Sequence, residues 1–166
     1  MPKLLKDQCI TEDNFLILNQ DQVDAGLPAG DLMLPITAID TAIKANSEHN
    51  GQIGIWFDSD EEPEHLVDKI SQFEVIGVNF PKFMDGRGYS IARLLRERFD
   101  YRGDVRAVGD ILVDQIYYLK RCGFNSFRLR EDQNPDYALN ALSTFSHDYQ
   151  TAANASEPVY RLRHQR

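Results

Sequence analysis

The sequence predicts a single α/β domain whose mainly parallel sheet is built from repeated strand-and-helix units. After residue 35, short β-branched or aromatic runs alternate with longer amphipathic segments, and helical crossovers of this kind join parallel strands. The chain has 166 residues, of which 42% are hydrophobic and 27% are charged, so it is large enough for one packed core. Both a partial barrel and an open three-layer sheet are compatible with this pattern.

The amino-terminal part has the least regular pattern. Short apolar runs at 15–18 and 32–34 predict two strands, and the polar segment 21–31 between them contains glycine and proline and predicts a loop. We expect this irregular, β-containing segment to form an extra layer or an edge of the sheet.

From residue 36 onwards, helices and strands alternate. Apolar residues at helical spacing predict the helices, and short β-branched runs predict the strands. The predicted helices cover 36–45, 63–73, 89–99, 111–122 and 135–147, and the predicted strands cover 53–57, 75–80, 105–108 and 126–129. We therefore expect one domain over residues 1–150, followed by a polar tail at 151–166.

Charge and cysteine content restrict the classes of function. The formal net charge is −8, which repels polyanions, so we expect no nucleic-acid partner. No apolar run is long enough to span a bilayer and residues 1–10 lack a secretory signal, so we expect a cytoplasmic protein without a membrane partner. The two cysteines cannot hold an iron–sulfur cluster alone, and no dinucleotide fingerprint is present, so no cofactor is predicted.

A glycine-rich, charged segment follows the strand predicted at 75–80. Glycines allow unusual backbone conformations, exposed amides at a helix start attract anions, and arginine presents a planar charge to an oxyanion. A structural role is the alternative, in which an aspartate caps the helix and an arginine pairs with a neighbouring carboxylate. The anion-binding candidates are Gly86, Arg87, Gly88, Ser90 and, from the next strand, Arg106.

Acidic residues at the same edge of the sheet form a second group of candidates. The acid/base or polar candidates are Asp85, Asp110 and Asp114. Because the carboxyl ends of parallel strands meet at one edge, we expect Asp85, Arg87, Arg106 and Asp110 around one shallow site. Such carboxylates suit acid/base or metal-assisted chemistry, and a network of caps and ion pairs is the alternative. Arg128 and Arg130 are weaker candidates, and no metal site is assigned.

Part of the chain resembles a bacterial family of unknown function, domain of unknown function 934. The resemblance is carried by Phe80-Pro81, Phe83, Asp85 to Ser90, Ala92 to Arg98, Tyr101 to Gly103, Arg106 to Asp110, Asp114-Gln115 and Arg121 to Phe124. Members of that family are often labelled probable oxidoreductases involved in sulfite reduction.

The resemblance implies a role in assimilatory sulfite reduction. Since the sequence lacks the signatures of a self-contained redox enzyme, we expect an accessory protein that binds sulfite reductase or an oxyanion. The alternative is a small enzyme that uses the Asp/Arg rim for acid/base or metal-assisted chemistry. Turnover by the isolated protein would favour the enzyme, and co-purification with the reductase would favour the accessory protein. The oligomeric state stays open.

Overall fold

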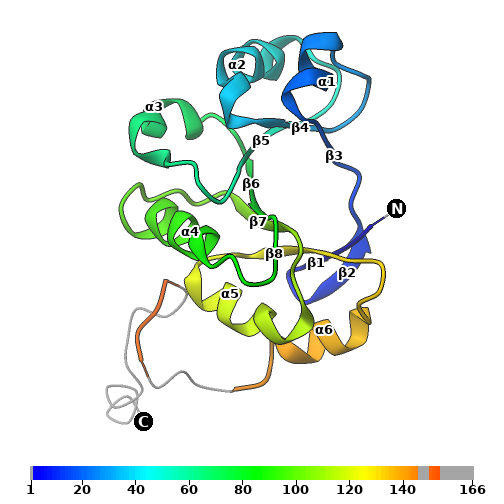
Figure 1. Cartoon of the computed structure of the whole chain (residues 1–166), viewed down its shortest axis with the longest axis vertical. Helices are drawn as coiled ribbons and strands as arrows, with labels where there is room; N and C mark the ends of the chain where they lie inside the picture. The colour runs from blue at the N-terminus through cyan, green and yellow to red at the C-terminus, as the bar shows by residue number, and fades with distance from the viewer. Residues whose placement is uncertain (1, 146–149, 154–166) are drawn as a thin grey trace.

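The computed structural model describes residues 2–145 and 150–153, with the backbone alone described at 65–67. Within these residues, eight strands form one sheet in the order β2-β1-β8-β7-β6-β5-β4-β3. Strands β3 to β8 are mutually parallel and lie in sequence order, whereas β1 is antiparallel to both β8 and β2. The sheet curls into a half-barrel with helices on its outer side (Figure 1). The predicted fold class is confirmed, in its partial-barrel form.

The strands and helices have the following bounds. The strands are β1 (Lys3–Lys6), β2 (Cys9–Glu12), β3 (Leu16–Ile17), β4 (Leu32–Pro35), β5 (Ile53–Phe57), β6 (Val75–Phe80), β7 (Asp104–Gly109) and β8 (Ser126–Leu129). The helices are α1 (Gln20–Ala25), α2 (Ile39–Glu48), α3 (Val67–Ile70), α4 (Arg87–Glu97), α5 (Ile116–Cys122) and α6 (Pro135–Ala141). Single 3₁₀ turns, η1 (Ile36–Ala38), η2 (Pro63–Leu66) and η3 (Val113–Gln115), precede α2, α3 and α5.

Alternate residues of each parallel strand face opposite sides of the sheet. Ile55, Val78 and Ala107 belong to the large core under the helices. Met33 and Val75 belong to a smaller apolar cluster on the concave side, where Phe15 of the amino-terminal segment packs against them. The central strands β5 to β7 are therefore buried on both faces, which explains their almost continuous apolar sequences.

The amino-terminal region differs from the prediction in two ways. Residues 20–25 form helix α1 instead of a loop, because Asn19 and Gln22 make a reciprocal capping box and Val23 is buried. The hairpin of β1 and β2 was not predicted, and it extends the same sheet at the β8 edge, where Leu5 lies opposite Phe127.

Residues 13–15 join β2 at one edge of the sheet to β3 at the other edge. This segment passes over the concave side, away from the helices (Figure 1). The connection spans the opening of the half-barrel and bounds the concave face from the front.

Three predicted helices are shorter than expected. The one predicted at 63–73 consists of η2 followed by α3, which ends at Ile70. The predicted helix at 111–122 is divided into η3 and α5, and Gln115 Oε1 accepts the Leu112 amide, so Asp110 does not cap this helix. Helix α6 ends at Ala141, and positions 146 and 147 of the predicted helix lie outside the described residues. In the described part of the chain, no helix has both the length and the apolar character needed to cross a membrane.

Candidate functional site

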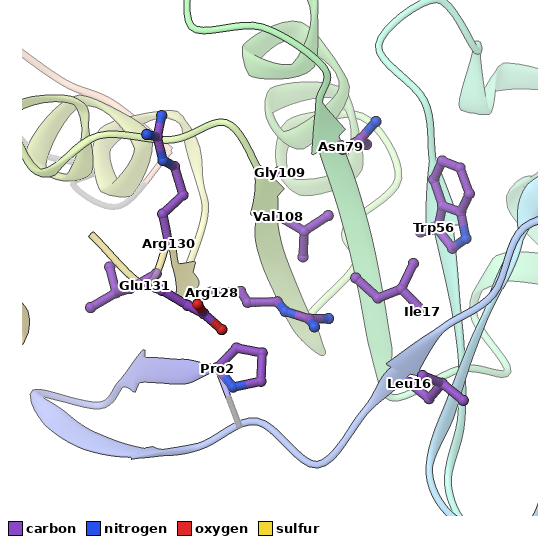
Figure 2. Close-up of a pocket in the computed structure, with 11 residues that line it drawn as sticks. Pro2, Leu16, Ile17, Trp56, Asn79, Val108, Gly109, Arg128, Arg130 and Glu131 are labelled. Atoms are coloured by element: carbon purple, nitrogen blue, oxygen red, sulfur yellow. The ribbon is translucent and has the colours of Figure 1, made fainter. Parts of the chain in front are cut away.

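A pocket of about 490 Å³ opens on the concave face of the half-barrel (Figure 2). Four of its lining residues are Trp56, Asn79, Val108 and Arg128, each the penultimate residue of its strand, from β5 to β8 respectively. Barrel sheets of this type place ligand sites at the carboxyl ends of their strands, because successive strand-to-helix loops converge there. The pocket therefore lies where the fold favours a binding site.

Arg128 supplies the positive charge inside the pocket. Its side chain extends between Val108 and Ile17, whereas Arg130 points away from this space (Figure 2). The Arg128 side chain is 23% exposed, and its polar contacts are long: Nε lies 3.8 Å from Asp13 Oδ2, and Nη1 lies 3.5 Å from the carbonyl oxygen of Phe15. The guanidinium is therefore partly desolvated and not tightly held by the described residues.

Apolar side chains form much of the pocket wall. Trp56 lines the pocket, and its Nε1 donates a hydrogen bond of 2.9 Å to the carbonyl oxygen of Leu18, which fixes the indole ring. Leu16 and Ile17 of β3 and Val108 of β7 add aliphatic surface. The pocket thus combines a fixed aromatic ring, aliphatic side chains and a cation.

Arg106 does not lie on the predicted rim. It is 3% exposed and faces the concave side, where Nη1 donates to Asp13 Oδ1 at 2.7 Å and Nη2 donates to Asp104 Oδ2 at 2.9 Å. The Phe15 ring covers the guanidinium, with its centroid 4.9 Å away. The placement of Arg106 beside Asp85 and Asp110 is therefore wrong, because two buried carboxylates already occupy its donors.

Asp104 is the centre of this buried network. Its carboxylate accepts hydrogen bonds from Ser126, Arg106 and Lys6, the last at 3.1 Å. Burial opposes ionisation of Asp104, but the hydrogen bond from Ser126 and the charge of Arg106 outweigh it, so the pKa of Asp104 is lowered. The network links β7, β8 and β1 to the segment that carries Asp13.

Asp85 and Arg87 pair with each other near the start of α4. Arg87 Nη2 lies 2.7 Å from Asp85 Oδ2, Ser59 Oγ donates to the same oxygen at 2.7 Å, and the Arg87 amide donates to Asp85 Oδ1. The hydrogen bond from Arg87, followed by that from Ser59, holds the pKa of Asp85 well below its usual range. This arrangement matches the structural alternative, and it makes Asp85 a weak proton acceptor at neutral pH.

The two candidate glycines have different surroundings. A Cβ atom at Gly88 would lie 2.9 Å from Phe80 Cζ and 3.1 Å from Val78 Cγ1, so Gly88 allows α4 to pack closely on β6. A Cβ atom at Gly86 would lie 3.8 Å from the Tyr89 ring, an ordinary contact distance. Gly88 therefore has a packing role at this helix start.

The remaining candidates divide between the pocket mouth and the outer surface. Asp110 accepts the Phe83 amide at 2.9 Å and pairs with Arg130, which lines the pocket and also pairs with Asp132. Ser90 and Asp114 are exposed on α4 and η3. The predicted single shallow site is thus replaced by separate ion-pair groups, one around Asp85 and one around Asp110. Among the residues that the structure describes, no three His, Cys, Asp or Glu side chains are grouped so that they could hold a metal ion.

Comparison with known families identifies the chain. A family model described as "Bacterial protein of unknown function (DUF934)" matches residues 54–160, which is more than half of the chain. The chain belongs to this family. No curated protein matches the sequence. The DUF934 match begins in β5 and includes the four penultimate strand residues that line the pocket, whereas β1 to β4, with the pocket residues Leu16 and Ile17, precede it.

Sequence reasoning on this DUF934 protein missed Trp56 and Asn79 as site residues, and it ranked Arg128 below the loop residues. A signal was present in the strands, because Asn79 and Arg128 are polar residues in otherwise largely apolar strand ends, and they occupy the same penultimate position as Trp56. Parallel strands in register bring such positions together on one face. The concave site was overlooked because loop charges were weighted above the strand side chains.

Proposed function

We propose that this DUF934 protein is an accessory protein of assimilatory sulfite reduction and that its concave pocket binds an oxyanion. One observation supports the oxyanion most directly, namely the position of the Arg128 guanidinium in the pocket, where its ion pair with Asp13 is long, at 3.8 Å from Nε to Oδ2. Hydrogen bonds between a guanidinium and an oxyanion are charge-assisted, and they strengthen where water is partly excluded.

Arg130 is less suited to this role than Arg128. Its guanidinium already pairs with Asp110 and with Asp132 Oδ2, the latter at 2.7 Å. A bound anion would have to compete with two carboxylates at Arg130, whereas at Arg128 it would compete with one carboxylate oxygen 3.8 Å away. The oxyanion is therefore assigned to Arg128.

The assignment to sulfite reduction rests on the label that members of the DUF934 family often carry. Sulfite reductase is the partner that this role implies. The rival function, an enzyme that uses the Asp/Arg rim, gains less support. The hydrogen bond from Arg87 lowers the pKa of Asp85, so this carboxyl is not arranged to donate a proton at neutral pH. Asp110 is already engaged by Arg130 and by the Phe83 amide.

Growth of a strain that lacks the protein tests the proposal. We expect this strain to grow poorly on sulfate as sole sulfur source and normally on cysteine, and wild-type protein to restore growth. Affinity purification from sulfate-grown cells should also recover sulfite reductase. Equal growth of the deletion and parent strains on sulfate would contradict a role in sulfite reduction, and substrate turnover by the isolated protein would favour the enzyme instead.

A further inference from the structure

We infer that the concave pocket takes an organic oxyanion, a small molecule that joins one sulfonate, phosphate or carboxylate group to a flat apolar body. The inference rests on the proposed function, since it uses the same pocket and the same Arg128, and it adds the chemical class of the ligand. Its three supports are the volume of the pocket, the composition of its wall and the direction of Arg128.

The volume of the pocket exceeds what an inorganic oxyanion fills. About 490 Å³ lies within the range of roughly 300–1,000 Å³ that is typical of small-molecule sites. Sulfite or sulfate has the size of a few water molecules, each of which takes about 30 Å³ in the liquid. A lone inorganic anion at Arg128 would leave most of the pocket filled with water.

The wall of the pocket suits a flat apolar group. The Trp56 ring is fixed by its bond to Leu18, and Ile17 and Val108 lie in the same pocket (Figure 2). An aromatic ring provides a large contact area together with preferred stacking geometries. Leu16 is 49% exposed and also lines the pocket, so a ligand with an apolar body would remove apolar surface from water.

The direction of Arg128 places the charge and the apolar wall within reach of one molecule. The side chain extends into the space between Val108 and Ile17, with Trp56 beyond Ile17 (Figure 2). The anionic group would bind the guanidinium, and the body of the ligand would lie along Trp56. Asp13 Oδ2 is buried and lies 3.8 Å from Arg128 Nε, which is beyond hydrogen-bond distance, so an anion at the guanidinium would compete with a long ion pair and not with a hydrogen bond from this carboxylate.

Fluorescence titration tests the inference directly, because Trp56 is the only tryptophan in the chain and lies in the pocket. The probes are phenyl phosphate, benzenesulfonate, the neutral benzyl alcohol, and inorganic sulfate. We expect saturable changes in Trp56 emission with the two aromatic anions, and at least about tenfold weaker binding of benzyl alcohol and sulfate.

Two arginine variants form a matched pair. Arg128→Met keeps the aliphatic stem and removes the charge, and it should weaken the aromatic anions by at least about tenfold. Arg93→Met is the control, because Arg93 is exposed on α4 and pairs with Glu97. Thermal melting checks that each variant is folded. If Arg128→Met does not fold, Leu16→Asp serves instead: it adds a negative charge at an exposed pocket position and should weaken the binding of the anions more than that of neutral benzyl alcohol.

The outcomes separate the inference from the proposed function. If sulfate binds as tightly as phenyl phosphate, and Arg128→Met abolishes the binding of both, the inference of an organic ligand would be overturned. The proposed oxyanion site at Arg128 would then still stand. If benzyl alcohol binds as tightly as the aromatic anions, or if Arg128→Met leaves anion binding unchanged, both the organic ligand and the oxyanion site at Arg128 would be overturned. If no probe binds, the inference fails, and growth on sulfate still decides the role in sulfite reduction.

Discussion

Gly86 and Gly88 stand two residues apart and provide a test of what the glycines at the start of α4 do. Gly88→Ala should destabilise the protein by about 1–3 kcal/mol, because its new methyl group meets Phe80 and Val78 at 2.9–3.1 Å. Gly86→Ala should change the free energy of unfolding much less, since its Cβ atom would meet only the Tyr89 ring, at an ordinary contact distance of 3.8 Å. Urea unfolding measures both, and equal effects of the two substitutions would argue against the packing role of Gly88.

Arg87 provides a second test at the residue scale. Arg87→Ala removes the exposed ion pair with Asp85, and surface ion pairs of this kind contribute little to stability. We expect nearly unchanged melting and normal growth on sulfate at equal protein abundance. Impaired growth with an unchanged melting temperature would instead return Arg87 to the functional site as an anion-binding residue.

At the scale of single residues, the sequence indicated which charged residues take part in interactions better than it indicated their ion-pair partners. The sequence left open whether Arg87 binds an anion or pairs with a neighbouring carboxylate, and in the structure it pairs with Asp85. The surroundings of Arg106 could not be predicted, because its partner Asp13 lies 93 positions away and approaches only through the crossing of residues 13–15. Contacts of this length depend on the path of the whole chain.

The crossing segment 13–15 depends on the buried charges beneath it. Asp104→Asn should destabilise the protein by about 3–5 kcal/mol at neutral pH, because it leaves Arg106 with one fewer negative partner in a buried position. Asp114→Asn, the same change at an exposed residue of η3, is the control. If the Asp104→Asn variant has the same free energy of unfolding as the wild type, Ser126 and Asp13 suffice to hold Arg106.

The pH dependence of stability follows from the same network. Because the pKa of Asp104 is lowered in the folded state, its contribution is present above the ordinary aspartate pKa of about 4. That contribution is lost as the pH falls through the folded-state pKa. Urea unfolding from pH 7 to pH 3 should therefore show a smaller loss of stability on acidification for Asp104→Asn than for wild-type protein.

At the scale of elements, regular units were predictable and irregular ones were not. Strands β5 to β7 have largely apolar sequences and are buried on both faces, and the predicted ranges of β5 to β8 agree with the structure to within a residue or two. Strands β1 and β2 have no such run, because residues 9–12 at the sheet edge are largely exposed. Their position depends on β8, which lies far along the chain.

The whole molecule is predicted to unfold as one unit although its amino-terminal hairpin precedes the family match. Leu5→Ala should destabilise the protein by about 2–5 kcal/mol, because Leu5 is fully buried in the main core. Trp56 reports from β5, on the far side of the parallel sheet from β1. The urea midpoints from Trp56 fluorescence and from far-ultraviolet circular dichroism should shift together.

Exposed Met84 offers the control for this measurement, since Met84→Ala removes a side chain that is 91% exposed. It should leave both midpoints unchanged. A Leu5→Ala variant whose fluorescence midpoint stays at the wild-type value while the dichroism signal shifts would show that the hairpin is a separate unit.

The pairing of β1 with β8 also determines the order in which parts of the sheet can form during synthesis on the ribosome. Lys3–Lys6 is synthesised before the rest of the sheet, yet its neighbour Ser126–Leu129 follows about 120 residues later, after every other parallel strand. At about 5–20 residues per second, the hairpin waits several seconds for its partner. During that interval Leu4 and Leu5 lack the strand that buries them, and residues 13–15 cannot yet cross to Arg106. The concave pocket is consequently among the last features of the nascent chain to form, so an unfinished polypeptide that stops before Ser126 lacks Arg128 and cannot bind the proposed oxyanion.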